Sequence, residues 1–154
     1  MKTTVFTAAD YVDVYAGKLM IVGTFDNIMA EKCPITFKPF GVAVKMLLEA
    51  HDKGKVFAGR LTLANAKTKK LVFKLNIRTQ LDVVSREKVN SIAMAFNLGG
   101  VRFDSFGEYQ LDLRLGSRLR ASTRLNVVKA KPSEKNKETR PSFVRMLSPQ
   151  NTPR

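Results

Sequence analysis

Few residues of this sequence have the type and spacing that catalysis needs. His51 is the single histidine, and it falls in a turn signal between two expected strands. A histidine that acts as a general acid or base needs a second group to orient it, and the sequence places none beside it. Cys33 is the single cysteine, and no Cys or His stands close enough to it to indicate a metal site or a redox pair. We expect His51 to be an exposed turn residue and Cys33 to be a small buried apolar side chain.

The carboxylates are dispersed along the chain. Asp10 and Asp13 are close in sequence, as are Asp104 and Glu108, but neither pair has the pattern of a calcium-binding loop. Asp10 and Asp26 would meet if the first two strands pair, although we favour a solvated pair or a turn cap. Because no set of residues can be assigned to a reaction, the sequence predicts no enzyme, and it indicates no cofactor or metal.

Basic residues give the strongest indication of a binding surface. Four arginines of the last strand pair occupy the phase opposite Leu113, Leu119 and Leu125, and they should project from one exposed face or its end: Arg114, Arg118, Arg120 and Arg124. Three further cations share the outward phase of another strand: Lys70, Lys74 and Arg78. If both strands belong to one sheet, these seven side chains form a basic surface able to contact phosphates.

Two interpretations of this basic surface remain open. It can bind nucleic acid, or it can be a solvated sheet face on which Lys and Arg discourage edge-to-edge aggregation. No exposed aromatic side chain is predicted for base stacking, because most phenylalanines fall on apolar phases. The formal net charge is +14, of which residues 1–128 carry +9 and residues 129–154 carry +5. This excess favours an anionic partner but does not bear on the fold.

Length and composition fit one cytoplasmic domain. A chain of 154 residues is long enough to bury roughly two thirds of its unfolded surface. No apolar run approaches the ~18 residues that a membrane span needs, so no membrane segment is expected. The first residues, MKTTVFTAADYV, contain no continuous apolar segment and no small-residue cleavage site, so no signal peptide is expected. A single cysteine agrees with a reducing compartment.

The elements that must position these residues are β-strands. From Tyr109 to Leu115 apolar and polar residues alternate, and the alternation resumes after Gly116-Ser117 with Leu119, which predicts a hairpin with a two-residue turn over residues 109–128. Four more strands are predicted from the inward-facing sets Val42, Val44, Met46 and Leu48; Phe57, Gly59, Leu61 and Leu63; Leu71, Phe73, Leu75 and Ile77; and Ile92, Met94, Phe96 and Leu98.

The remaining segments complete an all-β pattern. Residues 3–14 predict a strand bent near Ala8-Ala9, and the nearly continuous apolar run of residues 18–26 predicts a strand buried on both faces. Prolines within residues 27–39 predict a loop. Residues 79–90 have no clean period and predict a connection that crosses between sheets. About eight strands and no long helix indicate an antiparallel β-sandwich.

Residues 129–154 differ in composition from the rest of the chain. Charged residues, Pro, Ser and Asn dominate this segment, which cannot bury enough apolar surface to offset the entropy of ordering it. We predict a β-sandwich domain over residues 1–128 and a disordered basic tail over residues 129–154. Four apolar side chains in the tail could dock on a partner or on the sandwich, although a frayed terminus is favoured: Phe143, Val144, Met146 and Leu147.

Two stretches of the sequence resemble a known family. The first consists of residues 9–12 (ADYV), 17–19 (GKL) and 21–26 (IVGTFD), and the second runs from residues 97–98 (NL) through 102–103 (RF) to 106–109 (FGEY). Both are similar to a family of small uncharacterised bacterial β-sandwich proteins, over roughly residues 9–128. The resemblance implies an immunoglobulin-like or similar β-sandwich of unassigned function. It carries over no ligand and no catalytic residue.

A weaker resemblance concerns Asp104, Gly107 and Tyr109. They are similar to the tyrosine corner of immunoglobulin-like sandwiches, with one residue more than usual between Asp and Gly. The chain has one Cys and no Trp, which excludes an antibody-type domain. We expect a non-enzymatic interaction module that binds an unknown protein partner through an edge strand or a loop end. The alternative is a nucleic-acid-associated protein that uses the basic face and the tail.

Overall fold

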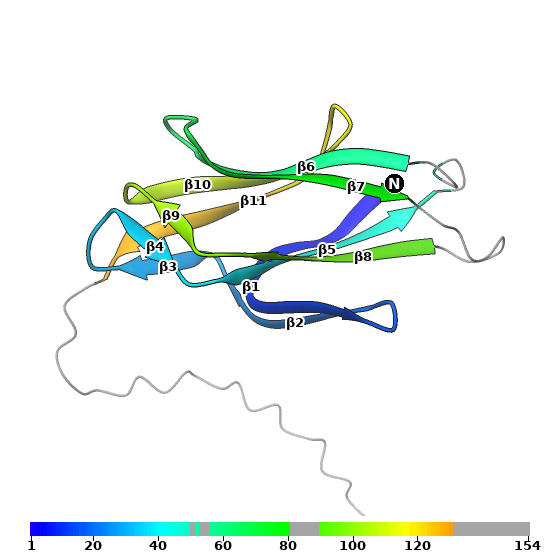
Figure 1. The fold of residues 1–154 in the computed structure, drawn as a ribbon, viewed down its shortest axis with the longest axis horizontal. Coiled ribbons are helices and arrows are strands. Elements are labelled where there is room, and N and C mark those ends of the chain that lie inside the picture. The colour runs from blue at the N-terminus through cyan, green and yellow to red at the C-terminus, as the bar shows by residue number, and fades with distance from the viewer. Residues whose placement is uncertain (50–51, 53–55, 81–89, 131–154) are drawn as a thin grey trace, which may run out of the picture.

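The chain folds into β-strands. The computed structural model describes residues 1–49, 52, 56–80 and 90–130. Over these residues it contains eleven strands in three sheets (Figure 1): β1 (Lys2–Tyr15), β2 (Lys18–Phe25), β3 (Asn27–Ala30), β4 (Ile35–Phe37), β5 (Phe40–Leu48), β6 (Val56–Asn65), β7 (Leu71–Gln80), β8 (Asn90–Leu98), β9 (Val101–Phe103), β10 (Gly107–Leu115) and β11 (Arg118–Lys129). The all-β prediction is confirmed, but the expected number of about eight strands is too low. The segment predicted as a loop, residues 27–39, contributes the short strands β3 and β4.

Two larger sheets carry most of the structure. One has the strand order β2-β1-β5-β8, with every neighbouring pair antiparallel. The other has the order β3-β11-β10-β6-β7, and in it β3 runs parallel to β11. A third, small sheet pairs β4 with β9. The chain passes from the second large sheet to the first between β7 and β8, as predicted, although residues 81–89 lie outside the described residues.

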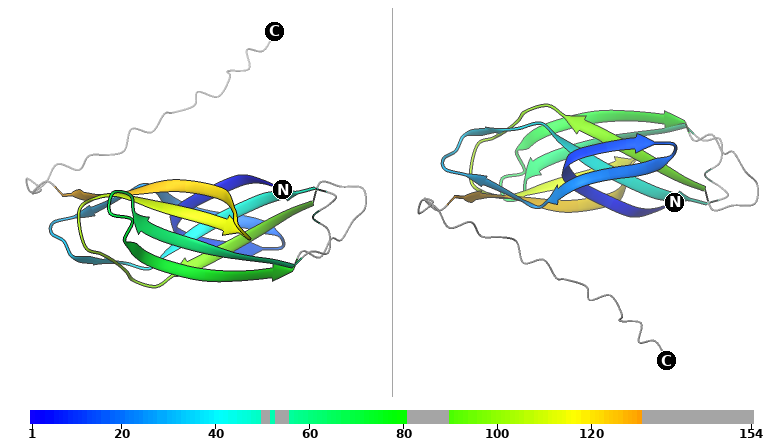
Figure 2. Two further views of the ribbon diagram at one scale, coloured as in Figure 1. Left: turned by 90° about the horizontal axis from the view of Figure 1, so that it is seen from above. Right: turned by 90° about the horizontal axis from the view of Figure 1, so that it is seen from below.

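The first large sheet curls like half of a barrel. The hairpin β1–β2 folds back over this sheet, so that β2 contacts β8 (Figure 2). Strand β1 bends to allow this. Ala9 and Val12 are both buried in one small cluster with Ala43, although residues three apart in a straight strand point to opposite faces. The small side chains at Ala8 and Ala9 mark the place where the strand turns.

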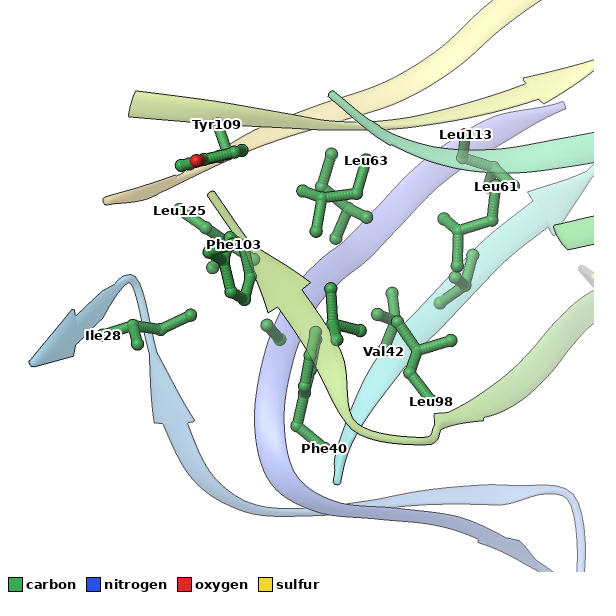
Figure 3. Close-up of a cluster of buried hydrophobic side chains, with 14 of the residues drawn as sticks. Ile28, Phe40, Val42, Leu61, Leu63, Leu98, Phe103, Tyr109, Leu113 and Leu125 are labelled. Carbon is green, nitrogen blue, oxygen red and sulfur yellow. The ribbon is translucent and has the colours of Figure 1, made fainter. Parts of the chain in front are cut away.

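The main core lies between the two large sheets. Figure 3 shows Val42 and Leu98 of the first sheet facing Leu61, Leu63 and Leu113 of the second. All five side chains are at most 2% exposed. Removing such side chains from water is the main force that holds two sheets together. The inward phase predicted for most positions of β5, β6 and β10 is therefore confirmed.

The predicted burial of one strand and of two single residues is wrong, in each case because of tertiary pairing. Strand β2 is not buried on both faces, because it lies at the edge of its sheet and leaves Met20 and Val22 exposed. Leu71 was expected inward but is 51% exposed, because a register shift in β6–β7 places it opposite Ala64. Leu119 was expected inward and is 48% exposed, for a similar reason described below.

Candidate binding surfaces

The outer face of the five-stranded sheet gathers cations from four strands. In the order β11-β10-β6-β7, the strands of both predicted basic sets belong to one sheet. Five cations occupy the phase of these strands that points away from the core, and the register places them on one face. We call these side chains the arginine face: Arg60, Lys74, Arg78, Arg114 and Arg124. Residues directly opposite each other in a sheet share a face.

Arg60 is the member of this face that sequence reasoning did not nominate. It lies on β6, between β10 and β7, and its register partner on β10 is Arg114. Its partner on β7 is Asn76. The alternation of β6 does give Arg60 an outward phase, but only the strand order shows that it stands directly beside another arginine. Like charges placed opposite each other in a sheet are destabilising unless something compensates them.

The four arginines predicted for the hairpin do not share one face. The β10–β11 register shifts between Leu113 and Arg114, so that Arg120 is an extra, bulged residue of β11. Its Nε atom is buried without a hydrogen-bond partner among the described residues. The bulge places Leu119 opposite Arg114 on the outer face, and Arg118 opposite the buried Leu115 at the sheet end.

Carboxylates neutralise part of the arginine face. Arg124 Nη1 lies 3.3 Å from Glu108 Oε2. Asp112 lies on the same face, and its carboxylate accepts a hydrogen bond of 2.6 Å from the Ser122 hydroxyl. Within the described part of the chain, the other four members of the face, Arg60, Lys74, Arg78 and Arg114, make no ion pair. The unpaired cations of the face therefore lie on β6, β7 and β10.

Lys70 is engaged elsewhere. Its ammonium group lies 2.7 Å from Asp104 Oδ2, and Arg102 Nε lies 3.2 Å from Asp104 Oδ1. The hydrogen bond from Lys70, followed by that from Arg102, lowers the pKa of the Asp104 carboxyl below its ordinary value. Lys70 therefore ties the β6–β7 turn to the segment after β9 and does not join the arginine face.

A second surface, which the sequence did not indicate, lies on the hairpin β1–β2. Four large side chains are 44–73% exposed there: Tyr11, Tyr15, Met20 and Val22. The register places Tyr11 opposite Val22, Met20 opposite Asp13, and Tyr15 opposite Lys18, so the four share one side of the hairpin. We call this surface the hairpin face. The Tyr11 hydroxyl donates to Asp13 Oδ2 at 3.1 Å, and this bond raises the pKa of Tyr11.

The hairpin face adjoins an unpaired strand edge. Strand β2 ends the order of the four-stranded sheet, and in the described part of the chain its second edge pairs with no strand. Exposed edges are usually blunted by charge or proline. From Leu19 to Phe25, β2 carries neither.

The remaining predicted chemistry is not assembled into a site. Cys33 is half-buried and packs against the core. Asp10 pairs with Lys38 at 2.8 Å. Among the described residues, no group of three His, Cys, Asp or Glu side chains could hold a metal ion. His51 and the tail residues Phe143, Val144, Met146 and Leu147 lie outside the described residues.

The predicted tyrosine contact is present. The Tyr109 hydroxyl donates to the Ser105 carbonyl at 2.8 Å, and the Ser105 amide donates back to that hydroxyl at 3.3 Å. Tyr109 is buried at the start of β10, with its ring edge-on to Phe103 at a centroid distance of 4.9 Å. This bond joins the β9–β10 loop to the core.

Over the described residues, no helix has the length and apolar character to cross a membrane.

Fold and surfaces together define an all-β protein with exposed sheet surfaces. The chain belongs to a family of unknown function, DUF6941, whose model matches residues 4–128. This agrees with the predicted resemblance to an uncharacterised family. No curated protein matches the chain.

Proposed function

We propose that this protein is a non-enzymatic, cytoplasmic interaction module with an immunoglobulin-like β-sandwich fold. Two features support the architecture. The order β11-β10-β6-β7 corresponds to strands G, F, C and C′ of a variable-type domain, and β1, β5 and β8 correspond to A, B and E. Tyr109 then stands near the start of strand F, where the tyrosine corner belongs.

The hairpin face is the surface that we propose binds a protein partner. Four large, exposed apolar or aromatic side chains on two adjacent strands form a patch, whereas single exposed apolar residues are ordinary on protein surfaces. Tyrosine and methionine are also enriched in protein interfaces. The patch lies beside the unpaired edge of β2, which offers backbone donors and acceptors to an incoming strand.

The partner is an extended apolar segment of another protein that adds a strand to β2. The two-residue turn Ala16-Gly17 makes Tyr15 and Lys18 a hydrogen-bonded pair, so the bonding groups of Leu19 and Ile21 point to the free edge. A strand added there gains main-chain hydrogen bonds from the edge and side-chain contacts from the hairpin face.

Site-specific photo-crosslinking tests this proposal. A photoreactive residue at Val22 should recover a protein that the same residue at Leu71 does not recover. Both positions are exposed and apolar, and both lie on edge strands. Purified partner should then bind Val22→Lys more weakly than Leu71→Lys and should protect the Leu19 and Ile21 amides from exchange. Equal recovery at the two positions, or unchanged binding by Val22→Lys, contradicts the proposal.

Nucleic-acid association is a second candidate, which the adjacent cations of the arginine face favour. Binding of a labelled oligonucleotide should weaken steeply as salt rises from about 50 to 200 mM. Replacing Arg60, Lys74 and Arg78 by Ser should lower the slope of log affinity against log salt by about 3, since each lost phosphate contact lowers it by about 1. The control replaces Lys2, Lys32 and Lys67, three exposed cations outside this face, by Ser. Equal effects of the two triple variants contradict a role for the arginine face.

A further inference from the structure

A hollow opens on the outer side of the five-stranded sheet, where the β10–β11 turn lies beside the start of β6. In Figure 1 this turn is the yellow loop next to β6. The hollow has a volume of about 400 Å³ and is lined by Ala58, Gly59, Arg60, Asn76, Gly116 and Ser117. Pockets for small ligands begin at about this size.

Small residues leave this space open. The Gly116 amide donates to the Ala58 carbonyl at 2.7 Å, which holds the turn against β6. Gly116 has a φ of +59°, a conformation that glycine adopts without strain. At Gly59 an added Cβ would collide with the Arg114 carbonyl oxygen and with the buried Leu115 side chain, so only glycine fits there between β6 and β10. Ala58, Gly59 and Gly116 bring only backbone and one methyl group to the lining, and its larger side chains are those of Arg60, Asn76 and Ser117.

One arginine lines the hollow, and two more lie beside it in the sheet register. Arg60 lines it, and Arg114 stands opposite Arg60 on β10. Arg114 Nη1 reaches to 3.4 Å from the Ser117 carbonyl, which brings its guanidinium to the rim. Arg78 is the register partner of Ala58 in the floor.

Among the described residues that line this site there is no Asp or Glu. On the same sheet face, the carboxylate nearest in register is that of Asp112. It lies opposite Thr62, which is the next outward residue of β6 after Arg60. The Asp112 carboxylate already accepts a hydrogen bond from the Ser122 hydroxyl. Neutral donors are present, since the Asn76 side-chain amide and the Ser117 hydroxyl can each donate to an oxyanion.

We propose that this hollow binds a phosphate monoester. Guanidinium groups bind phosphate by paired, charge-assisted hydrogen bonds, and the dianion would offset the adjacent charges of Arg60 and Arg114. Asn76 and Ser117 supply neutral donors to the remaining oxygens. The hollow is the size of a pocket for one small molecule, so the ligand is a single terminal phosphate and not a run of backbone phosphodiesters. This site lies away from the hairpin face and goes beyond the proposed interaction function.

The test is a titration of the full chain followed by amide NMR. Three probes are added separately: inorganic phosphate, a nucleoside monophosphate, and an oligonucleotide without terminal phosphates. The first two should shift the amides of Gly59, Gly116 and Ser117 at concentrations of about 1 mM, where weak specific binding is measurable. Arg60→Ser should weaken binding about tenfold, as expected for one charged hydrogen-bonding partner. Arg60→Lys keeps the charge but loses the paired donors, so its affinity for phosphate should lie between those of the unaltered protein and Arg60→Ser.

Arg124→Ser is the matched control. It removes the same charge from the same sheet face, at an arginine already paired with Glu108. Its affinity for phosphate should change less than twofold. Equal losses in Arg60→Ser and Arg124→Ser would show a general charge effect and overturn the site, as would the absence of any shift with both small phosphates. Shifts with the oligonucleotide alone would also overturn the phosphate site, and they would support nucleic-acid association instead. None of these outcomes bears on crosslinking at Val22.

Discussion

Val12 of β1 packs directly onto the bare backbone of Gly41 in β5. A Cβ atom built on Gly41 would lie 2.5 Å from Val12 Cγ2, closer than real contacts allow. Val12 is fully buried in the small cluster between the folded-back hairpin and the sheet beneath it. The hairpin face and the free edge of β2 therefore keep their positions only because this glycine lets the hairpin approach.

The first prediction is that Gly41→Ala destabilises the fold. The added methyl group must displace Val12 or the strand, and such overpacking costs about 1–3 kcal/mol of unfolding free energy. Denaturant unfolding followed by circular dichroism measures this. The control is Gly99→Ala, where an added Cβ meets nothing within 4 Å. Val12→Ala should restore part of the stability of Gly41→Ala; no restoration would show that the collision with Val12 is not the cause.

The second prediction concerns the tyrosine contact. Tyr109→Phe keeps the buried ring but removes the hydroxyl that donates to the Ser105 carbonyl and accepts from its amide. Loss of these bonds should lower the unfolding free energy by about 1–2 kcal/mol, because the Ser105 groups are left partly buried. Tyr15→Phe, at a side chain 73% exposed, should have no measurable effect. Similar midpoints for the two variants would contradict the role assigned to Tyr109.

The third prediction tests the bulge in β11. Leu125→Ala should cost about 2–5 kcal/mol, because it leaves a cavity in the core. Leu119→Ala should change stability by less than about 0.5 kcal/mol, because Leu119 lies on the outer face. The two substitutions are chemically identical and occupy the same strand. Comparable losses in thermal or denaturant unfolding would mean that Leu119 is inward and that the register has no bulge.

The fourth prediction is a pH effect at Asp104. Its carboxyl has a pKa below the ordinary value in the folded protein, chiefly because of the hydrogen bond from Lys70. A group with a lowered folded pKa stabilises the fold above its unfolded pKa, and this contribution is lost as the pH falls through the folded pKa. Lys70→Met should therefore raise the pKa of Asp104 towards its ordinary value, as followed by NMR titration of the carboxyl carbon.

Lys67→Met is the control for this titration, since Lys67 lies in the same turn and its side chain makes no ion pair within the described residues. It should leave the Asp104 titration where it is in the unaltered protein. If Lys70→Met also leaves it in place, the ion pair is not what lowers the Asp104 pKa.

The sequence by itself determined the all-β class and most of the core. Alternation is a property of one strand, because successive side chains point to opposite faces whatever lies next to them. It therefore identified Val42, Leu61 and Leu111 as inward residues without knowledge of the strand order. The Tyr109 contact was also accessible, since the hydroxyl reaches only four residues upstream.

Only the tertiary structure decided which surfaces are exposed and which cations meet. The apolar run of β2 predicted burial on both faces, but an edge strand has one neighbour and leaves Met20 and Val22 in solvent. Leu119 left its predicted phase because one extra residue in a bulge shifts pairing with the neighbouring strand. Arg60 and Arg114 are 54 residues apart and meet only because β6 pairs with β10. Register and strand order arise from pairing between distant segments, and the alternation within one segment does not encode them.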